Sequence, residues 1–210
     1  MMLPMRHIIG IDEVGRGCLA GPVLVAALVL PHKIQLQRKS LPKLRDSKKL
    51  SAIQRRLWFD FVKKHPKISF ATSRVLPQSI DKINISASAN RAASRAFAKL
   101  TTNNRSLITK AKTYLDGGLY LNSKILTANR STLNARTLVR GDEKINAIKL
   151  ASIVAKVTRD KYMTKLHKRY PKYGFDAHKG YGTLRHRQAI RKHGSSEVHR
   201  KSFCNNIRVV

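Results

Sequence analysis

The stretch His7–Leu30, HIIGIDEVGRGCLAGPVLVAALVL, decides the fold because it holds two apolar runs around a glycine-rich turn. The runs HIIGI and PVLVAALVL are short and rich in β-branched residues, which predicts two paired strands. Asp12 and Glu13 lie side by side between the first run and the turn, in a chain with 43 basic and only 11 acidic residues. Two adjacent carboxylates at this place are the first candidates for a functional site.

The overall composition indicates the class of partner. A chain of 210 residues with 42% hydrophobic content is long enough for one sizeable domain with an ordinary core. Its formal net charge of +32 attracts polyanions and favours contacts with phosphate groups. A basic surface that only keeps the protein in solution is the alternative interpretation. Charge alone therefore predicts nucleic acid as the partner and does not distinguish an enzyme from a binding protein.

Cysteine usage and apolar run lengths predict the compartment. Cys18 and Cys204 are the only cysteines, too few for a disulfide framework or a cysteine-rich zinc site. No run reaches the roughly 18 apolar residues of a membrane span. The first residues, MMLPMRH, lack the layout of a signal peptide. We therefore expect a cytoplasmic protein that does not contact a membrane.

The order of predicted elements defines the fold class. Beyond the two paired strands, strand-like runs occupy KISFATSRVL, KTYLD and ARTLV, and helical patterns occupy residues 51–65, 85–100, 145–170 and 184–192. Ser51 is a plausible N-cap of the first helix. Three strands followed by helices alternating with two more strands predict a mixed α/β sheet flanked by helices. We expect one domain, residues 1–210, with a helical C-terminal portion from about residue 161.

Three aspartates share one local context. Asp12, Asp116 and Asp142 each follow an apolar strand-like run and lie close to a glycine. If the strands are neighbours, their ends gather these carboxylates together with Glu13 or Glu143. Clustered carboxylates repel one another unless a cation or a proton intervenes, and oxygen ligands of this kind suit Mg²⁺ or Mn²⁺. Two such ions about 4 Å apart would serve phosphodiester cleavage. The alternative is a set of unrelated turn aspartates.

Other acidic residues have simpler interpretations. We expect Asp60 to be a surface or ion-pair residue, Asp160 to pair with an arginine, and Asp81 to cap a local turn. Asp176 and Glu197 lie among basic residues, where exposed ion pairs contribute little to stability. The histidines show no HExxH spacing and the chain has no GxxxxGK[ST] loop, which argues against zinc and against a nucleotide-driven motor.

Several blocks, in this order, resemble the motifs of bacterial ribonuclease HII: GIDEVGRGCLAGPV, LRDSKKLS, YLDGG, VRGDEKINAIKLASIVAKVTRD, YPKYGFDAHKGYGTLRH and HRKSF. The similarity extends from about residue 7 to residue 203. Arg16 between its two glycines favours type HII over type HIII. The resemblance implies an RNase H-like fold and a metal-dependent endoribonuclease that cuts RNA paired with DNA. It also implies incision 5′ of single ribonucleotides in duplex DNA, leaving 5′-phosphate and 3′-hydroxyl ends.

The resemblance also assigns residues. It makes Asp12, Glu13, Asp116 and Asp142 the catalytic, metal-binding set, with Glu143 left without a role. The triplet Gly15, Arg16 and Gly17 would contact the 2′-hydroxyl, which distinguishes a ribonucleotide from its neighbours, because glycine lets the main chain approach a ligand closely. Tyr181 resembles the family tyrosine that stacks on a sugar. Ser47 and Lys48 resemble a phosphate-contacting loop; alternatively they are ordinary solvated residues.

One segment departs from the family pattern. The connection from Asp116 to Asp142 is longer than usual, and LTANRST within it predicts a turn, which suggests a hairpin. The assignment of Asp142 therefore depends on its GD and ASIVAKVTRD context rather than on spacing. Two other classes of protein remain open. A non-catalytic basic nucleic-acid-binding protein has no use for carboxylates that face phosphate, and a junction resolvase has no evident use for GRG and HKGYG. We expect a monomer whose partners are RNA–DNA hybrids and ribonucleotide-containing DNA.

Overall fold

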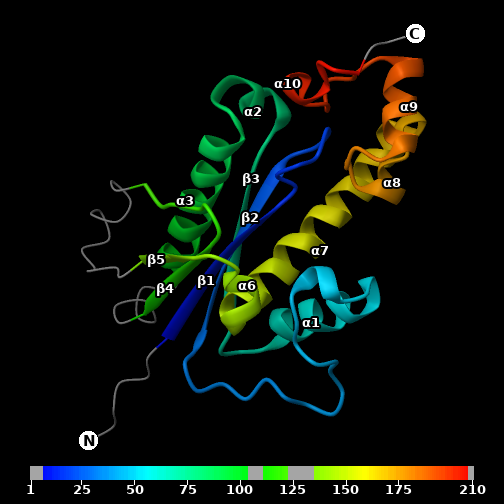
Figure 1. Ribbon diagram of the computed structural model, residues 1–210. Coiled ribbons are helices and arrows are strands. Elements are labelled where there is room, and N and C mark those ends of the chain that lie inside the picture. Colours follow the sequence, from blue (N-terminus) through cyan, green and yellow to red (C-terminus); the bar gives the residue numbers. More distant parts are fainter. Residues whose placement is uncertain (1–6, 104–110, 123–134, 208–210) are drawn as a thin grey trace, which may run out of the picture.

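A five-stranded mixed sheet forms the centre of the computed structural model, which describes residues 7–103, 111–122 and 135–207 (Figure 1). Its strand order is β3-β2-β1-β4-β5, so β1 lies in the middle. The strands are β1 His7–Val14, β2 Val23–Pro31, β3 Ser69–Val75, β4 Lys112–Asp116 and β5 Ala135–Leu138. The predicted mixed sheet, and the pairing of its first two strands, are confirmed.

Strand direction decides where the acidic side chains meet. β1 pairs antiparallel with β2, and β2 with β3, so these three strands form a meander. β1 and β4 run parallel, as do β4 and β5. Parallel neighbours have their carboxyl ends at the same edge of the sheet, and in α/β sheets that edge is where ligands bind. Asp12 near the end of β1 and Asp116 at the end of β4 therefore lie at one edge.

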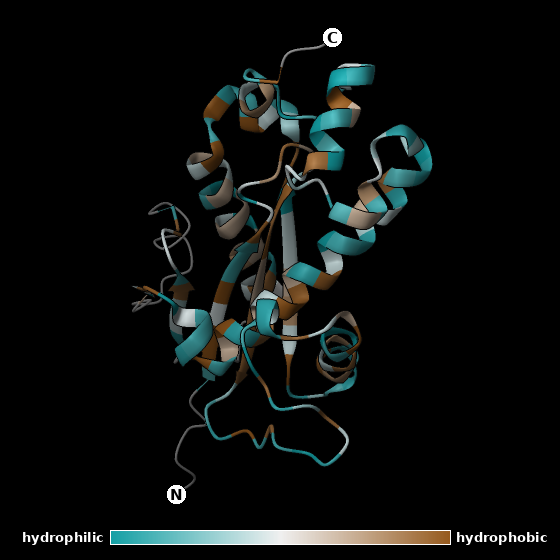
Figure 2. Ribbon diagram, turned by 45° about the vertical axis from the view of Figure 1, so that its right-hand side comes forward, coloured by the Kyte–Doolittle hydropathy of each residue, from teal (hydrophilic) through white to brown (hydrophobic). Residues whose placement is uncertain are grey.

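Helices cover both faces of the sheet. Helix α3 (Ile85–Asn103) lies on one face, and α1 (Ala52–Lys64) and α7 (Asn146–Arg169) lie on the other (Figure 1). Every residue of β2 is buried, as expected for a strand that is covered on both sides. Hydrophobic residues gather on the central strands, and the helices show hydrophilic outer faces (Figure 2). The buried apolar surface of the sheet explains how so basic a chain folds.

Local signals account for the helix boundaries. Ser51 accepts a hydrogen bond from the amide of Gln54, whose side chain returns one to the amide of Ser51. This capping box confirms the predicted start of α1. The chain also forms α2 (Pro77–Ile83), which sequence reasoning missed. The shorter elements are η1 Ser47–Lys49, α6 Gly141–Lys144, η2 Pro171–Tyr173, α8 Phe175–His178, α9 Leu184–His193 and α10 Lys201–Cys204.

The C-terminal helices pack around a separate apolar cluster that includes Met163, Phe175 and Ile190. Helix α7 runs unbroken through residue 161, so the sheet and the C-terminal portion share this helix. The expected single domain over residues 1–210, with a helical C-terminal extension from about residue 161, stays a prediction. The LTANRST turn lies outside the described residues. Cys18 and Cys204 are both buried and free. Within the described ranges, no helix is long and apolar enough to cross a membrane.

Candidate active site

Three carboxylates meet at the carboxyl edge of the sheet. Asp12 comes from β1, Asp116 from the end of β4 and Asp142 from α6, and one oxygen from each lies within 4.8 Å of the others. The pairing of Ile11 with Leu115 brings the first two together on adjacent parallel strands. The predicted convergence of strand ends is therefore found, although Asp142 lies in a short helix beyond β5 rather than at a strand end.

Two backbone amides fix the position of Asp142 relative to Asp116. Oδ1 of Asp116 accepts hydrogen bonds from the amides of Gly141, at 2.6 Å, and Asp142, at 3.3 Å. Arg140 precedes them with a positive φ of 55°, which turns the chain into α6. Charge-assisted hydrogen bonds of this kind are short and strong. They join the end of β4 to α6 and hold Asp142 beside Asp116.

Electrostatic repulsion within the cluster is strong. Burial, then the charge of Glu13 and then that of Asp116, raise the pKa of Asp12 well above its ordinary range. Burial raises the pKa of Asp142, and Asp116 adds to this, while Lys48 opposes it. Such carboxylates are stable as anions only when positive charge is close by.

Glu13 lies beside the three aspartates rather than among them. Burial raises its pKa, and Arg16, whose Nη1 is 3.1 Å from Oε1, opposes the shift. Its second oxygen, Oε2, is buried and has no hydrogen-bond partner in the described part of the chain. An unpartnered buried carboxylate oxygen is costly unless a ligand completes it. This oxygen and the three converging aspartates form an all-oxygen donor set, which fits a divalent cation such as Mg²⁺ or Mn²⁺.

The predicted phosphate-contacting loop lies against the cluster. Nζ of Lys48 is 4.0 Å from Oδ2 of Asp142, and its side chain is 84% exposed. Ser47 is buried, and its hydroxyl lies 2.8 Å from the hydroxyl of Ser152 on α7. Ser152 also lies next to Asp12 and acts to lower the pKa of that carboxyl. The exposed Lys48 side chain can therefore reach a ligand. The Ser47 hydroxyl instead faces inward and supports the site through its contact with Ser152.

The glycine-rich turn and the tyrosine loop lie next to each other. Cys18 forms an isolated β-bridge with Tyr181, which brings the two predicted substrate-binding segments into contact. Tyr181 is 39% exposed as a residue, and Nζ of Lys156 lies 5.6 Å from the centroid of its ring. Arg16, which pairs with Glu13, also donates to Ser86 at the start of α3. The structure therefore brings the GRG triplet, the tyrosine and the carboxylates into one region.

Three acidic residues outside the cluster make structural contacts. Asp60 pairs with Arg56 on α1, as expected. The expected arginine partner of Asp160 was wrong, because its partner is Lys156. Asp81 does not cap a local turn: it accepts hydrogen bonds from the amides of Lys201 and Ser202 at the start of α10.

Sequence reasoning gave no role to Ser152, Arg159 or Arg200. Ser152 is a polar residue on an otherwise apolar stretch of α7, which is a detectable signal. Arg159 and Arg200 are fully buried, and among the many basic residues nothing in their spacing distinguishes them.

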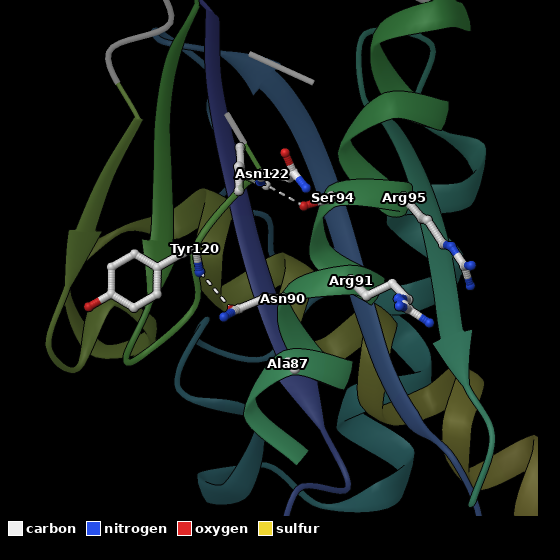
Figure 3. A pocket seen from close by; sticks show the side chains of 8 residues that line it. Ala87, Asn90, Arg91, Ser94, Arg95, Tyr120 and Asn122 are labelled. Atoms are coloured by element: carbon white, nitrogen blue, oxygen red, sulfur yellow. Dashed lines mark hydrogen bonds between the residues drawn. The ribbon is translucent and has the colours of Figure 1, made fainter. Parts of the chain in front are cut away.

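A hollow of about 750 Å³ lies beside α3, and none of the clustered carboxylates lines it (Figure 3). Asn90 accepts a hydrogen bond from the amide of Tyr120 there, and Ser94 accepts one from the amide of Asn122. None of its lining residues is a predicted site residue: they are Ala87, Asn90, Arg91, Ser94, Arg95, Tyr120, Leu121 and Asn122.

A mixed sheet whose parallel strand ends bring three aspartates together defines the class of RNase H-like nucleases with a divalent-cation site. The family model described as "Ribonuclease HII" matches residues 9–206. The chain belongs to this family. It is a ribonuclease H that acts on RNA–DNA hybrids.

Individual relatives agree with this assignment. The ribonuclease HII of Bacillus mycoides is 42% identical over 199 residues, which cover 95% of this chain and 69% of the relative. A solved ribonuclease HII from Archaeoglobus fulgidus, in complex with PCNA, superposes with a TM-score of 0.67 at 23% identity and 93% coverage of both chains. A Bst-RNase HIII in complex with Mn²⁺ gives 0.63 at 18% identity, over 97% of this chain and 69% of that one. The two structural likenesses establish the fold.

Proposed function

We propose that this ribonuclease H cuts the RNA strand of hybrids internally and also incises 5′ of single ribonucleotides in duplex DNA, leaving 5′-phosphate and 3′-hydroxyl ends. The observation that carries the proposal is the convergence of Asp12, Asp116 and Asp142 within 4.8 Å, at an edge that also holds the GRG triplet. A hydroxyl-sensing segment next to a carboxylate cluster suits an enzyme that selects one sugar and cuts beside it.

The cluster is proposed to hold two Mg²⁺ or Mn²⁺ ions, with Asp12, Glu13, Asp116 and Asp142 as ligands. Divalent ions supply Lewis-acid activation of water and neutralise charge on the departing oxygen. The chain's own contribution is to fix the ligand oxygens before substrate arrives. Ser152 orients Asp12, and the Gly141 amide orients Asp116.

Selection of the ribonucleotide is proposed to depend on main-chain groups of Gly15, Arg16 and Gly17. The 2′-hydroxyl donates and accepts hydrogen bonds, so backbone groups are suitable partners. Tyr181 would stack against a sugar and hold the strand in register, and Lys48 would contact a phosphate. Ser47 is proposed to support the loop that carries Lys48, because its hydroxyl is already paired.

The test is a DNA duplex with one labelled ribonucleotide, incubated with and without Mg²⁺ or Mn²⁺. We expect one metal-dependent cut on the 5′ side of the ribonucleotide and none in the matched all-DNA duplex. The ends are identified by whether the downstream fragment is a substrate for phosphatase and the upstream fragment for polymerase extension. Cleavage of long hybrids with no cut at the single ribonucleotide would contradict the finer activity and leave the ribonuclease H assignment intact. Light scattering tests the expected monomer.

A further inference from the structure

Two arginines are completely buried next to the substrate-reading loops. Arg159 on α7 and Arg200 just before α10 both have 0% exposure. Arginine is almost never fully buried unless it is paired. No carboxylate in the described part of the chain lies within ion-pair distance of either guanidinium. Their hydrogen bonds go to main-chain carbonyls instead.

Arg200 binds the glycine-rich turn. Its Nη2 donates to the carbonyl of Gly15 at 2.6 Å and its Nη1 to that of Arg16 at 2.8 Å. Its Nε donates to the carbonyl of Gly21 at 3.0 Å. One planar guanidinium thus fixes both ends of the turn. Lysine, whose ammonium is a single point of contact, cannot reproduce this fork.

Arg159 joins the same turn to the tyrosine loop. Its Nε donates to the carbonyl of Pro22 at 2.9 Å and its Nη2 to that of Ala20 at 3.1 Å. Its Nη1 donates to the carbonyl of Lys179, two residues before Tyr181, at 2.8 Å. The two arginines together make hydrogen bonds to six carbonyls and lock both loops into one unit.

Glycines in these loops fit around the arginines. A Cβ atom on Gly15 would lie 2.2 Å from Nε of Arg159, and one on Gly180 would lie 2.4 Å from the carbonyl of Ala20. Both glycines have φ of +87°, a conformation that favours glycine. Part of the glycine pattern therefore serves the packing of a buried cation, in addition to any approach of substrate.

Burying two like charges is expensive, so the arrangement needs a reason. Burial lowers the pKa of Arg200 to about 10, and the nearby charge of Arg159 adds to this, so the group is still protonated at neutral pH. Replacing buried charge by apolar side chains is often neutral or stabilising in proteins. Holding the loops together does not by itself require two cations. Their planar, forked donors also fix the direction of six particular carbonyls.

The carbonyl directions set the amide directions. In a trans peptide the N–H points opposite to the C=O of the same unit. With the carbonyls of Gly15 and Arg16 bonded inward, the amides of Arg16 and Gly17 point away from Arg200. Neither amide donates to another group in the described residues. Two adjacent donors are therefore aimed outward from the turn.

We propose that Arg200 is a positioning residue for ribonucleotide selection, which orients the Arg16 and Gly17 amides toward the 2′-hydroxyl and adjoining phosphate, and that Arg159 holds the tyrosine loop against the same turn. The inference rests on the proposed function of the GRG triplet and extends it to residues that touch no substrate. Both arginines act through the peptide planes that they hold.

The first test measures discrimination in Arg200→Lys, with Arg191→Lys on the exposed face of α9 as the matched control. Both are studied in an Asp12→Asn background so that duplexes are bound and not cut. The measured quantity is the ratio of affinities for a single-ribonucleotide duplex and the matched all-DNA duplex. Because a misdirected amide loses its hydrogen bond to the 2′-hydroxyl, we expect the ratio to fall roughly tenfold. All-DNA affinity should change less than threefold, since the charge is kept.

Outcomes separate the two proposals. A parent protein with no preference for the ribonucleotide overturns the proposed function. A parent preference that Arg200→Lys retains overturns the positioning role alone. A merely structural arginine would lower both affinities together and leave their ratio unchanged, which also overturns it.

The second test needs no arginine variant and so does not depend on one that folds. In ¹⁵N-labelled Asp12→Asn protein, the Arg16 and Gly17 amide resonances should shift differently with the ribonucleotide duplex than with the all-DNA duplex. The amide of Gly194, in a turn after α9, is the internal control. Identical shifts with the two duplexes at Arg16 and Gly17 would overturn the inference.

Discussion

The carboxylate of Asp116 accepts a hydrogen bond from the amide of Gly141 at 2.6 Å, across 25 positions of sequence. This contact joins the end of β4 to the start of α6, and it places Asp142 next to Asp116. A side chain at position 141 would be crowded by two neighbouring side chains. A Cβ atom there would lie 2.5 Å from Cδ1 of Ile148 and 3.2 Å from Oδ1 of Asp116.

Gly141→Ala should therefore lower the cleavage rate by about 100-fold, because the new methyl displaces α6 and the Asp142 carboxylate with it. The double variant with Ile148→Val should recover much of the rate, since valine lacks the Cδ1 atom that the methyl meets. Single-turnover cleavage of a hybrid measures both, with Ile148→Val alone as the control. If the double variant is as slow as Gly141→Ala, crowding against Ile148 is not the cause.

Asp12→Asn should make the metal-free protein more stable while it abolishes cleavage. Burial raises the pKa of Asp12, so the folded state binds the proton more tightly than the unfolded state. Stability from this group is then present at low pH and lost as pH rises through the raised pKa. In EDTA at pH 7 the variant should melt at a higher temperature than wild type, and the difference should shrink toward pH 4.

Adding metal should stabilise the wild-type protein more than the Asp12→Asn variant, the reverse of the difference expected in EDTA. Mg²⁺ should raise the melting temperature of wild type more than that of Asp12→Asn, because ligand binding to the folded state stabilises it. Binding of hybrid should be equal or tighter in the variant, since a negative charge facing phosphate is removed. Equal melting temperatures in EDTA at pH 7, or undiminished cutting, would contradict the role given to Asp12.

A buried histidine pair should make the protein sensitive to mild acid. Nδ1 of His186 lies 2.9 Å from the carbonyl of Tyr181, which only accepts, so this nitrogen carries a proton. Nε2 of His186 then accepts from Nε2 of His199, 3.2 Å away, and Nδ1 of His199 accepts from the Ser196 amide. Both rings are neutral in this chain of donors, and a further proton on Nδ1 of His199 would break its bond from the Ser196 amide, leaving only the Ser196 hydroxyl as acceptor.

Burial accordingly lowers the pKa of both His186 and His199 to about 4. A histidine with a lowered folded pKa binds fewer protons in the folded state, so stability falls as pH drops from about 6.5 toward 4. We expect the wild-type melting temperature to fall over this window, and His199→Gln, which can still donate to His186, to show a shallower fall. His193→Gln at the end of α9 is the control and should keep the wild-type slope.

Local signals explain what the sequence predicted well. Ser51 starts α1 through contacts within four residues, and strand pairing around the GRG turn follows from two apolar runs that are close in the chain. Asp12 and Asp116 were expected to meet if their strand-like runs were neighbours, and the parallel pairing of β1 with β4 provides that arrangement. Each of these inferences depends on a residue type with few other structural roles in this chain: a serine at a helix start, an apolar run, or one of the scarce aspartates.

No local sequence pattern predicts the contacts that the buried arginines and histidines make. Arg200 bonds carbonyls 179 and 185 positions away, and every residue has a carbonyl, so the acceptors have no characteristic residue type. Asp81 likewise caps a helix 120 positions later. Long-range contacts to main-chain groups depend on the finished fold. That is why the residues that brace the site were missed while those that form it were not.

Tyr181 tests whether the exposed ring guides substrate. Its carbonyl is held by His186, and its ring lies 5.6 Å from Nζ of Lys156 and 5.9 Å from Cζ of Arg159, so the backbone is fixed while the residue is 39% exposed. Tyr181→Ala should lower the rate on a single-ribonucleotide duplex by about 100-fold through loss of strand register. Tyr181→Phe keeps the ring and should lose less than tenfold. Tyr170→Phe, which removes a hydroxyl at the far end of α7, is the control and should match wild type. A Phe variant as slow as Ala would assign the role to the hydroxyl, and an Ala variant as fast as wild type would make Tyr181 purely structural.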